Sequence, residues 1–141
     1  MGEHPPAGHR RVPHTADLRI EAWAPSRERC VAEAVTALVD SFTEMPPELP
    51  TTTVGFRAEP GTDEDLLVGV LDEVIFRMDT AGQLPADVEV TAADGGLDVQ
   101  FRMVDTDRVE LIGAVPKAVS LYELRFERRE ADWACAVTLD V

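Results

Sequence analysis

One segment near the middle of the chain limits the fold more than any other. It begins with Thr62-Asp63-Glu64-Asp65, the Ser/Thr-x-x-Asp/Glu pattern of a helix capping box, and the apolar residues that follow repeat with the helical period. These apolar residues are Leu66, Leu67, Val70, Leu71, Val74, Ile75 and Met78. A stripe this wide must be covered by another layer of structure and is typical of a helix that lies on a sheet. We therefore predict a helix that ends near residues 80–82 and packs on a sheet.

The segments before this helix contain one further helix between two strands. Residues 17–23 alternate between apolar and polar side chains, which predicts a half-buried strand. Ser26 is then a suitable N-cap for a helix over residues 27–43, and Pro46-Pro47 prevents its continuation. A short strand is expected at residues 54–58.

The second half of the chain is rich in strand patterns. Asp94-Gly95-Gly96 predicts the turn of a hairpin between a strand that begins at residue 88 and a strand over residues 97–103. Residues 109–115 are expected to be extended or irregular, and residues 118–128 to alternate with Tyr122, Leu124 and Phe126 on one face. In the last strand, Asp140 falls on the face opposite to Trp133, Cys135, Val137 and Leu139.

These elements predict an α+β fold in a single domain, with a largely antiparallel sheet of about six or seven strands and two helices packed on it. A chain of 141 residues is long enough for one core but short for two domains. Residues 1–11 contain Pro5, Pro6 and Gly8 without an apolar run, and we predict a flexible leader there. The domain itself is expected over residues 12–141.

Composition limits the partners and the location of the protein. The chain has 27 acidic residues against 13 lysines and arginines, a formal net charge of -14, which argues against direct binding to nucleic acid. No apolar run approaches the length of a membrane span, so no membrane association is expected. Cys30 and Cys135 lie in apolar-periodic segments without C-x-x-C spacing. They predict free core cysteines and a cytoplasmic protein.

Carboxylates near the two ends of the chain are candidates for a metal site. Asp17 begins the first strand on its polar face, whereas Asp140 and the terminal carboxylate of Val141 end the last strand. Pairing of these strands would place up to three carboxylates around one point, where a divalent cation that prefers oxygen, Ca²⁺ or Mg²⁺, would relieve their repulsion. His14 is interpreted as a packing or capping residue, and Lys117 as a solvated lysine at a strand entry.

Four segments in this order resemble motifs of the archease family. They are His14-Thr15-Ala16-Asp17 with the strand up to Ala22-Trp23, Asp65-Leu66-Leu67 with Leu71-Asp72-Glu73, Lys117-Ala118-Val119-Ser120, and Trp133 through Leu139-Asp140-Val141. The resemblance covers nearly all of residues 12–141. It implies a protein that is not itself an enzyme and that activates an RtcB-type RNA ligase, the enzyme that joins 2′,3′-cyclic-phosphate and 5′-hydroxyl ends in tRNA splicing and RNA repair. The activator promotes GTP-dependent guanylylation and multiple turnover of the ligase.

The resemblance also implies roles for individual residues. Asp17, Asp140 and Val141 match the divalent-metal ligands of the family, and Lys117 matches a lysine needed for activation. The implied cofactor is a divalent metal ion, Ca²⁺ in the first place and Mg²⁺ or Mn²⁺ otherwise. The chain departs from the family pattern at Ala24-Pro25, Arg27, Val104-Asp105-Thr106 and Ser120-Leu121-Tyr122, positions that affect the partner surface more than the metal ligands.

Two other functions remain open on the sequence. One is a chaperone-like modulator of RNA-modifying enzymes such as a tRNA methyltransferase, which would act without the metal. The other is a metal-dependent hydrolase with Asp17 or Asp140 as the general base on a bound water, which lacks a recognisable nucleophile.

Overall fold

The computed structural model describes residues 6–13 and 17–141, and within them it contains nine strands, two α-helices and one short 3-10 helix. In chain order these are β1 (Gly8–Pro13), β2 (Leu18–Ala24), α1 (Arg27–Asp40), β3 (Thr43–Glu44), β4 (Thr52–Ala58), α2 (Asp63–Ala81), β5 (Gln83–Ala93), β6 (Gly96–Asp105), η1 (Thr106–Arg108), β7 (Glu110–Leu111), β8 (Ala118–Arg128) and β9 (Trp133–Asp140). The predicted α+β class and its antiparallel pairing are confirmed.

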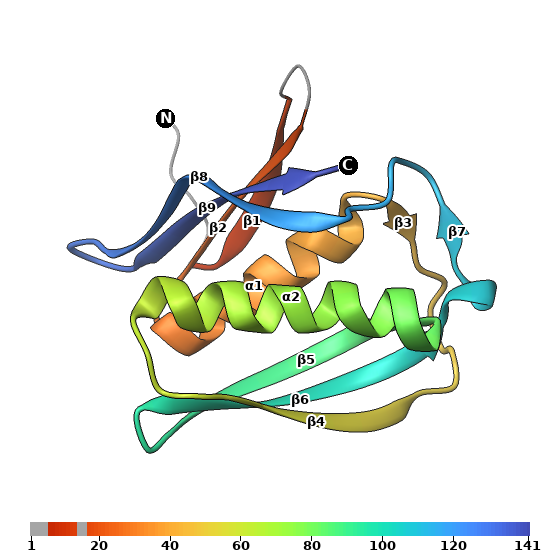
Figure 1. Ribbon diagram of the computed structural model, residues 1–141, viewed down its shortest axis with the longest axis horizontal. Coiled ribbons are helices and arrows are strands. Elements are labelled where there is room, and N and C mark those ends of the chain that lie inside the picture. The colour runs from red at the N-terminus through yellow and green to blue at the C-terminus, as the bar shows by residue number, and fades with distance from the viewer. Residues whose placement is uncertain (1–5, 14–16) are drawn as a thin grey trace.

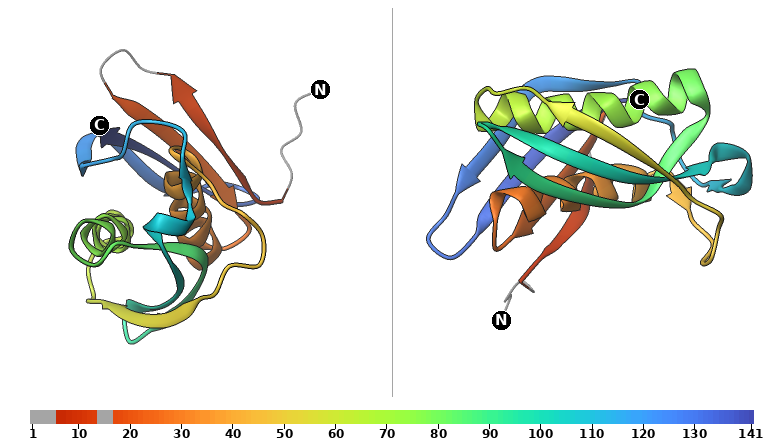
Figure 2. Two further views of the ribbon diagram at one scale, coloured as in Figure 1. Left: turned by 90° about the vertical axis from the view of Figure 1, so that its right-hand side faces the viewer. Right: turned by 90° about the horizontal axis from the view of Figure 1, so that it is seen from below.

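The two helices lie between two separate sheets (Figures 1 and 2). The first sheet has four strands in the order β1-β2-β9-β8 and the second has three in the order β4-β6-β5, while β3 and β7 form a small two-stranded ribbon. All the pairings are antiparallel. Helix α1 contacts β2 and β5, and α2 contacts β8 and β5, so each helix reaches both sheets. The strands are therefore divided between layers and not joined in one sheet.

Both helices begin at the caps that the sequence predicts. The Ser26 hydroxyl accepts a hydrogen bond of 3.2 Å from the Arg29 backbone N–H at the start of α1. At the start of α2, the Thr62 hydroxyl accepts from the Asp65 backbone N–H at 3.1 Å, and the Asp65 carboxylate accepts from the Thr62 backbone N–H at 3.4 Å. Each cap contributes about 1 kcal/mol to helix stability. Gly82 ends α2 with a φ of 62°, a left-handed conformation that glycine adopts without strain.

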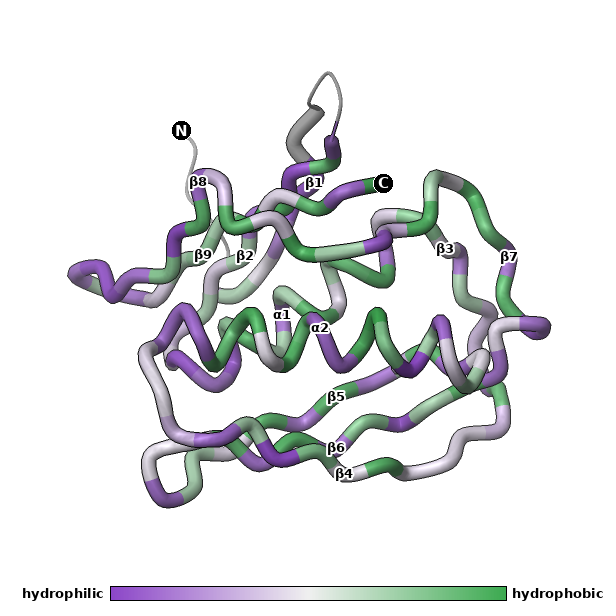
Figure 3. Tube along the Cα trace, viewed as in Figure 1, coloured by the Kyte–Doolittle hydropathy of each residue, from purple (hydrophilic) through white to green (hydrophobic). Residues whose placement is uncertain are grey.

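The core fills the space between the sheets. The predicted stripe of α2 is buried from Leu66 to Ile75, and Met78 is partly buried against the same cluster. Apolar positions of the strands face these helices, and the tube in Figure 3 shows apolar residues recurring along the inner elements. Among the described residues, no helix is long and apolar enough to cross a membrane.

Strand β1 was not predicted, because its residues lack apolar alternation. Residues 8–11, which the sequence analysis assigns to a flexible leader, belong to this strand and pair with β2. Arg10 Nε donates to Glu21 Oε1 at 2.5 Å, and His9 lies 2.8 Å from Glu33 and 3.1 Å from Asp40 of α1. Backbone pairing and ion pairs with acidic neighbours thus hold this basic segment, which includes residues 8–11, against the domain.

The regular alternation predicted for residues 118–128 is wrong in the middle of β8. Ser120 pairs with Thr138 of β9, and the next paired residue of β8, Arg125, lies opposite Ala136. Four residues of β8 between these pairs therefore lie opposite a single residue of β9. The extra residues form a bulge in which Glu123 has a φ of 53°. Leu121 and Tyr122 are consequently 70% and 65% exposed, whereas Phe126, beyond the bulge, is buried.

The two cysteines are free and lie together in the core. Cys30 on α1 donates to the carbonyl of Ala22 at 3.7 Å, and Ala22 is the register partner of Cys135 in β9. A hydrogen bond with the Cys135 thiol, together with burial, raises the pKa of the Cys30 thiol far above its usual value. Only the thiolate is a nucleophile, so this thiol is chemically inert in the folded protein.

We expect both thiols to react with a disulfide-exchange reagent at pH 8 only when the protein unfolds. The native reaction should be at least about 100-fold slower than the reaction in guanidinium chloride, because it requires opening of the core. Stopped-flow absorbance of the released thiol measures both rates. A Cys135→Ala variant identifies the contribution of Cys30, and a native thiol that reacts as fast as free cysteine would contradict the packing described above.

Candidate functional site

Three segments that are distant in sequence end at the same edge of the four-stranded sheet. In the β2–β9 pairing, Leu18 lies opposite Leu139, so Asp17 and Asp140 are the next residues along the two chains at this end. In the β8–β9 pairing, Ala118 lies opposite Asp140, and Lys117 immediately precedes β8. Figure 1 shows the C-terminal end of β9 beside the start of β8. The backbone register therefore brings Asp17, Asp140 and Lys117 to the same end of the sheet, with Val141 following Asp140.

The backbone fixes this arrangement independently of the side chains. The Lys117 backbone N–H donates to the carbonyl of Asp140 at 2.7 Å. Leu139 is fully buried in the core, whereas Asp140 on the opposite face is exposed, as alternation predicts. Asp17 is half-buried, and both Lys117 and Val141 are exposed. Charged residues at the ends of three chain segments thus lie at one end of the sheet.

The acidic residues at this edge lack a positively charged partner within the described part of the chain. Neither Asp17 nor Asp140 forms a salt bridge with a described residue. Arg19 is two residues from Asp17 on β2, but its guanidinium donates to neutral oxygens, at 2.7 Å to Thr138 Oγ1 and at 2.8 Å to the Glu123 carbonyl. The two carboxylates therefore remain available to an external cation.

The donors at this edge suit a hard cation by their chemistry. Asp17 and Asp140 offer carboxylate oxygens, the ligands that Ca²⁺ and Mg²⁺ prefer. Within residues 6–13 and 17–141, no three His, Cys, Asp or Glu side chains lie close enough to hold a metal ion. A site here would therefore need a further donor such as a main-chain carboxylate. The segment His14-Thr15-Ala16, part of the predicted motif, lies outside the described residues.

Arg19 is a residue of this region that the sequence analysis did not single out. It is 8% exposed and holds the β8 bulge to the sheet through the Glu123 carbonyl. The bulge starts directly after Ser120, whose register partner Thr138 accepts the other guanidinium bond. The sequence shows only an arginine on the polar face of a strand, so no local pattern identifies its distant partners.

Lys117 is the single lysine of the sequence, and the other residues counted as Lys or Arg are all arginines. It lines a groove of about 760 Å³ between α2 and the segment that enters β8, which is also lined by Asp72, Phe76, Asp79 and Val115. The lysine is thus shared between the edge with the carboxylates and this groove.

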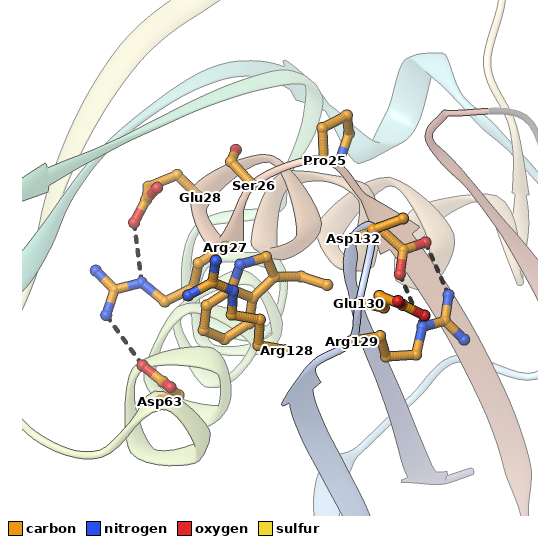
Figure 4. A pocket seen from close by; sticks show the side chains of 11 residues that line it. Pro25, Ser26, Arg27, Glu28, Asp63, Arg128, Arg129, Glu130 and Asp132 are labelled. Atoms are coloured by element: carbon orange, nitrogen blue, oxygen red, sulfur yellow. Dashed lines mark hydrogen bonds and ion pairs between the residues drawn. The ribbon is translucent and has the colours of Figure 1, made fainter.

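A second hollow lies at the opposite end of β8 and β9, and its charged residues are largely paired with one another. It has a volume of about 480 Å³ and includes the first residues of α1 and α2 (Figure 4). Arg27 donates to Glu28 at 2.9 Å and to Asp63 at 3.0 Å, and Arg129 donates to both carboxylate oxygens of Asp132 at 2.8 Å. These pairs link the helix starts and close the β8–β9 turn, which is a structural role.

Related proteins cover almost the whole chain. The Archease protein family (MTH1598/TM1083) matches residues 9–141. A probable archease of Mycobacterium tuberculosis is 51% identical over 135 residues, which cover 96% of this chain and 75% of that protein. The archease of Methanopyrus kandleri is 31% identical over 136 residues, which cover 92% of this chain and 96% of that protein.

Two solved structures have the same fold. Protein 1598 of Methanobacterium thermoautotrophicum superposes with a TM-score of 0.71 at 22% identity, covering 95% of this chain and 99% of that one. An archease of Thermotoga maritima, described as a possible chaperone, gives a TM-score of 0.65 at 21% identity, covering 100% of this chain and 98% of that one. These identities support the fold alone, while the family match and the closer relatives establish membership. The chain belongs to the archease family.

Proposed function

We propose that this protein is a metal-binding activator of an RtcB-type RNA ligase and promotes its GTP-dependent guanylylation and multiple turnover in tRNA splicing and RNA repair. The observation that carries the proposal is the meeting of Asp17, Asp140 and Lys117 at one sheet edge in a member of the archease family. Asp17 immediately precedes β2, Lys117 immediately precedes β8 and Asp140 ends β9, so segments that are distant in sequence supply the proposed site. On this proposal the protein is not an enzyme and acts in the cytoplasm.

The charge of the chain favours a protein partner. A formal net charge of -14 repels the phosphates of RNA but complements the basic surface of an RNA-binding enzyme. Electrostatic attraction of this kind raises the association rate and selects the orientation of the complex. The protein would therefore meet the ligase and not the RNA directly.

The proposed metal ligands are the carboxylates of Asp17 and Asp140 and the main-chain carboxylate of Val141. Their support is the oxygen-only donor set and the absence of an ion pair to either aspartate among the described residues. The fitting ion is Ca²⁺ in the first place and Mg²⁺ or Mn²⁺ otherwise. When bound, it would add a positive charge beside Lys117 at the edge that faces the partner. Asp140 would hold the ion on its side chain while its carbonyl keeps the start of β8 in place.

A second candidate is a chaperone-like modulator of RNA-modifying enzymes, such as a tRNA methyltransferase. The observation that favours it is the description of the Thermotoga maritima relative as a possible chaperone. Such a modulator would change the solubility or specificity of its partner without requiring a metal. Dependence on Asp17 and Asp140 therefore separates the two functions.

We expect equimolar protein to accelerate guanylylation of the ligase from the same organism, and the Lys117→Ala variant to lose most of this effect. The backbone N–H of residue 117 still reaches the Asp140 carbonyl in the variant, so the strand pairing survives. Labelled GMP on the ligase, followed over time after addition of GTP, measures the rate.

The matched control is Arg108→Ala, which removes one positive charge from η1 and should retain activation. Equal rates with and without the wild-type protein would rule out the activator function. Acceleration that survives chelation of divalent ions and both aspartate substitutions would instead favour the chaperone-like function.

The substitutions Asp17→Asn and Asp140→Asn should each weaken Ca²⁺ binding at least about tenfold, because each removes one charged oxygen ligand. Isothermal titration calorimetry with Ca²⁺ measures the affinity. Asp94→Asn is the matched control, since it removes the same charge from the β5–β6 turn at a φ of 46° that asparagine tolerates. Wild-type affinity in both site variants would refute these ligands.

Residues added after Val141 test the main-chain ligand separately. A Gly-Ser extension moves the carboxylate away from Asp140 and should lower Ca²⁺ affinity about tenfold, while the same residues added at the N-terminus should not. The comparison uses the same titration. Unchanged affinity in the C-terminally extended protein would exclude the main-chain carboxylate as a ligand and leave the two aspartates to be judged by their own variants.

A further inference from the structure

The groove between α2 and the entry to β8 has features of a docking surface that the proposed metal site does not explain. One wall is the outer face of α2 and the other is the segment over residues 115–118. Its volume of about 760 Å³ is large enough to accept side chains of another protein. The lining residues are Asp72, Ile75, Phe76, Met78, Asp79, Val115, Pro116, Lys117 and Ala118.

The apolar part of the groove is incompletely covered. Phe76 is 57% exposed on α2, and Val115 is 38% exposed on the other wall. Ile75 and Met78, which also line the groove, belong to or pack against the core. An apolar side chain placed in this groove would remove the ring of Phe76 and the side chain of Val115 from water, and large aromatic residues of this kind are frequent anchors of interfaces.

Two acidic side chains flank this apolar part without a positive partner. Asp72 precedes Phe76 by one helical turn and Asp79 follows it by three residues, and neither forms a salt bridge with a described residue. Asp72 is exposed as a residue, but partial burial of its carboxylate raises the pKa of this group. On the same helix, Glu73 is paired with Arg77 at 2.8 Å. Asp72 and Asp79, unlike Glu73, thus lack an ion-pair partner among the described residues.

We propose that this groove docks a segment of the RNA ligase that presents an apolar side chain next to lysine or arginine. The apolar side chain would contact Phe76 and Val115, and the basic side chain would pair with Asp72 or Asp79. This inference rests on the proposed function and specifies the surface through which it is exerted. Lys117 connects the two regions, because it lines the groove and its backbone is bonded to Asp140.

Charge complementarity favours this occupant over a second copy of the chain. Two copies would each bring a formal net charge of -14 to the contact, and their association would be opposed by repulsion. A basic segment instead supplies the counter-ion that Asp72 and Asp79 lack. Binding should therefore weaken as the salt concentration rises.

The test measures the affinity of purified ligase for the wild-type protein and two groove variants by biolayer interferometry at low and high salt. Phe76→Ala should weaken binding about tenfold or more, as expected for an aromatic anchor. Asp72→Asn should weaken it severalfold at low salt and reduce the salt dependence. Both residues are exposed, so thermal unfolding of the variants should match that of the wild type.

Two control variants remove an exposed apolar side chain and an acidic charge at positions outside the groove. Leu111→Ala removes an apolar side chain that is 54% exposed on β7, outside the groove, and Asp94→Asn removes an acidic charge from the β5–β6 turn. Both should bind within about twofold of the wild type, as substitutions outside an interface do.

Wild-type affinity in Phe76→Ala, an equal loss in Leu111→Ala, or no binding of the ligase to the wild-type protein would overturn the inference. So would dimerisation of the wild-type protein alone that Phe76→Ala abolishes, since the groove would then hold a second copy. The guanylylation assay is read separately. Binding through the groove without acceleration would reject the activator function, whereas acceleration that Phe76→Ala leaves intact at wild-type affinity would reject only the groove.

Discussion

Strand β9 is the element on which the rest of the structure depends. It pairs with β2 on one side and with β8 on the other, and its residues Cys135, Val137 and Leu139 are buried against the helices. The two registers determine which residues of β2 and β8 lie beside Asp140. A one-residue slip in either pairing would turn the apolar face outward and separate the candidate site residues. Core packing and site geometry are therefore fixed by the same contacts.

Local patterns predict the elements well where their signals are contained in a few adjacent residues. The capping box at Thr62 and the apolar stripe of α2 are of this kind, and both are confirmed. The position of Asp140 on the face opposite Leu139 was predicted for the same reason, since alternation is a property of one strand, although Thr138 on the face of Asp140 is buried. The sequence did not determine whether Asp17 and Asp140 lie side by side. Their proximity depends on the pairing of β2 with β9, which are far apart in the sequence.

The features that were missed depend on distant partners. Strand β1 has no apolar alternation and is held by β2 and by the acidic residues of α1. The β8 bulge requires Arg19, which is 104 residues away from the Glu123 carbonyl that it binds. Helix α1 ends at Asp40 and not at residue 43, because Thr43 enters the short pairing with β7. In each case tertiary contact decides a structure that the local sequence leaves undetermined.

Arg19 illustrates how a buried charge can be accommodated without neutralisation. Its guanidinium is bonded to a hydroxyl and a carbonyl, so its polar groups are satisfied although no described carboxylate pairs with it. An ion pair of Arg19 with Asp17 or Asp140 would have neutralised a negative charge at this end of the sheet. The observed arrangement uses the arginine as a support for the bulge and leaves the acidic groups exposed to the surroundings.

The hydrogen bond from the Lys117 N–H to the Asp140 carbonyl has a consequence for motion. It is the outermost bond between the β8 and β9 segments at this end, and terminal bonds of a ladder open more readily than central ones. A ligand that contacts both segments would hold this bond closed, which costs conformational entropy. Binding of a ligand at this end of the sheet would therefore also change local order at the entry to β8.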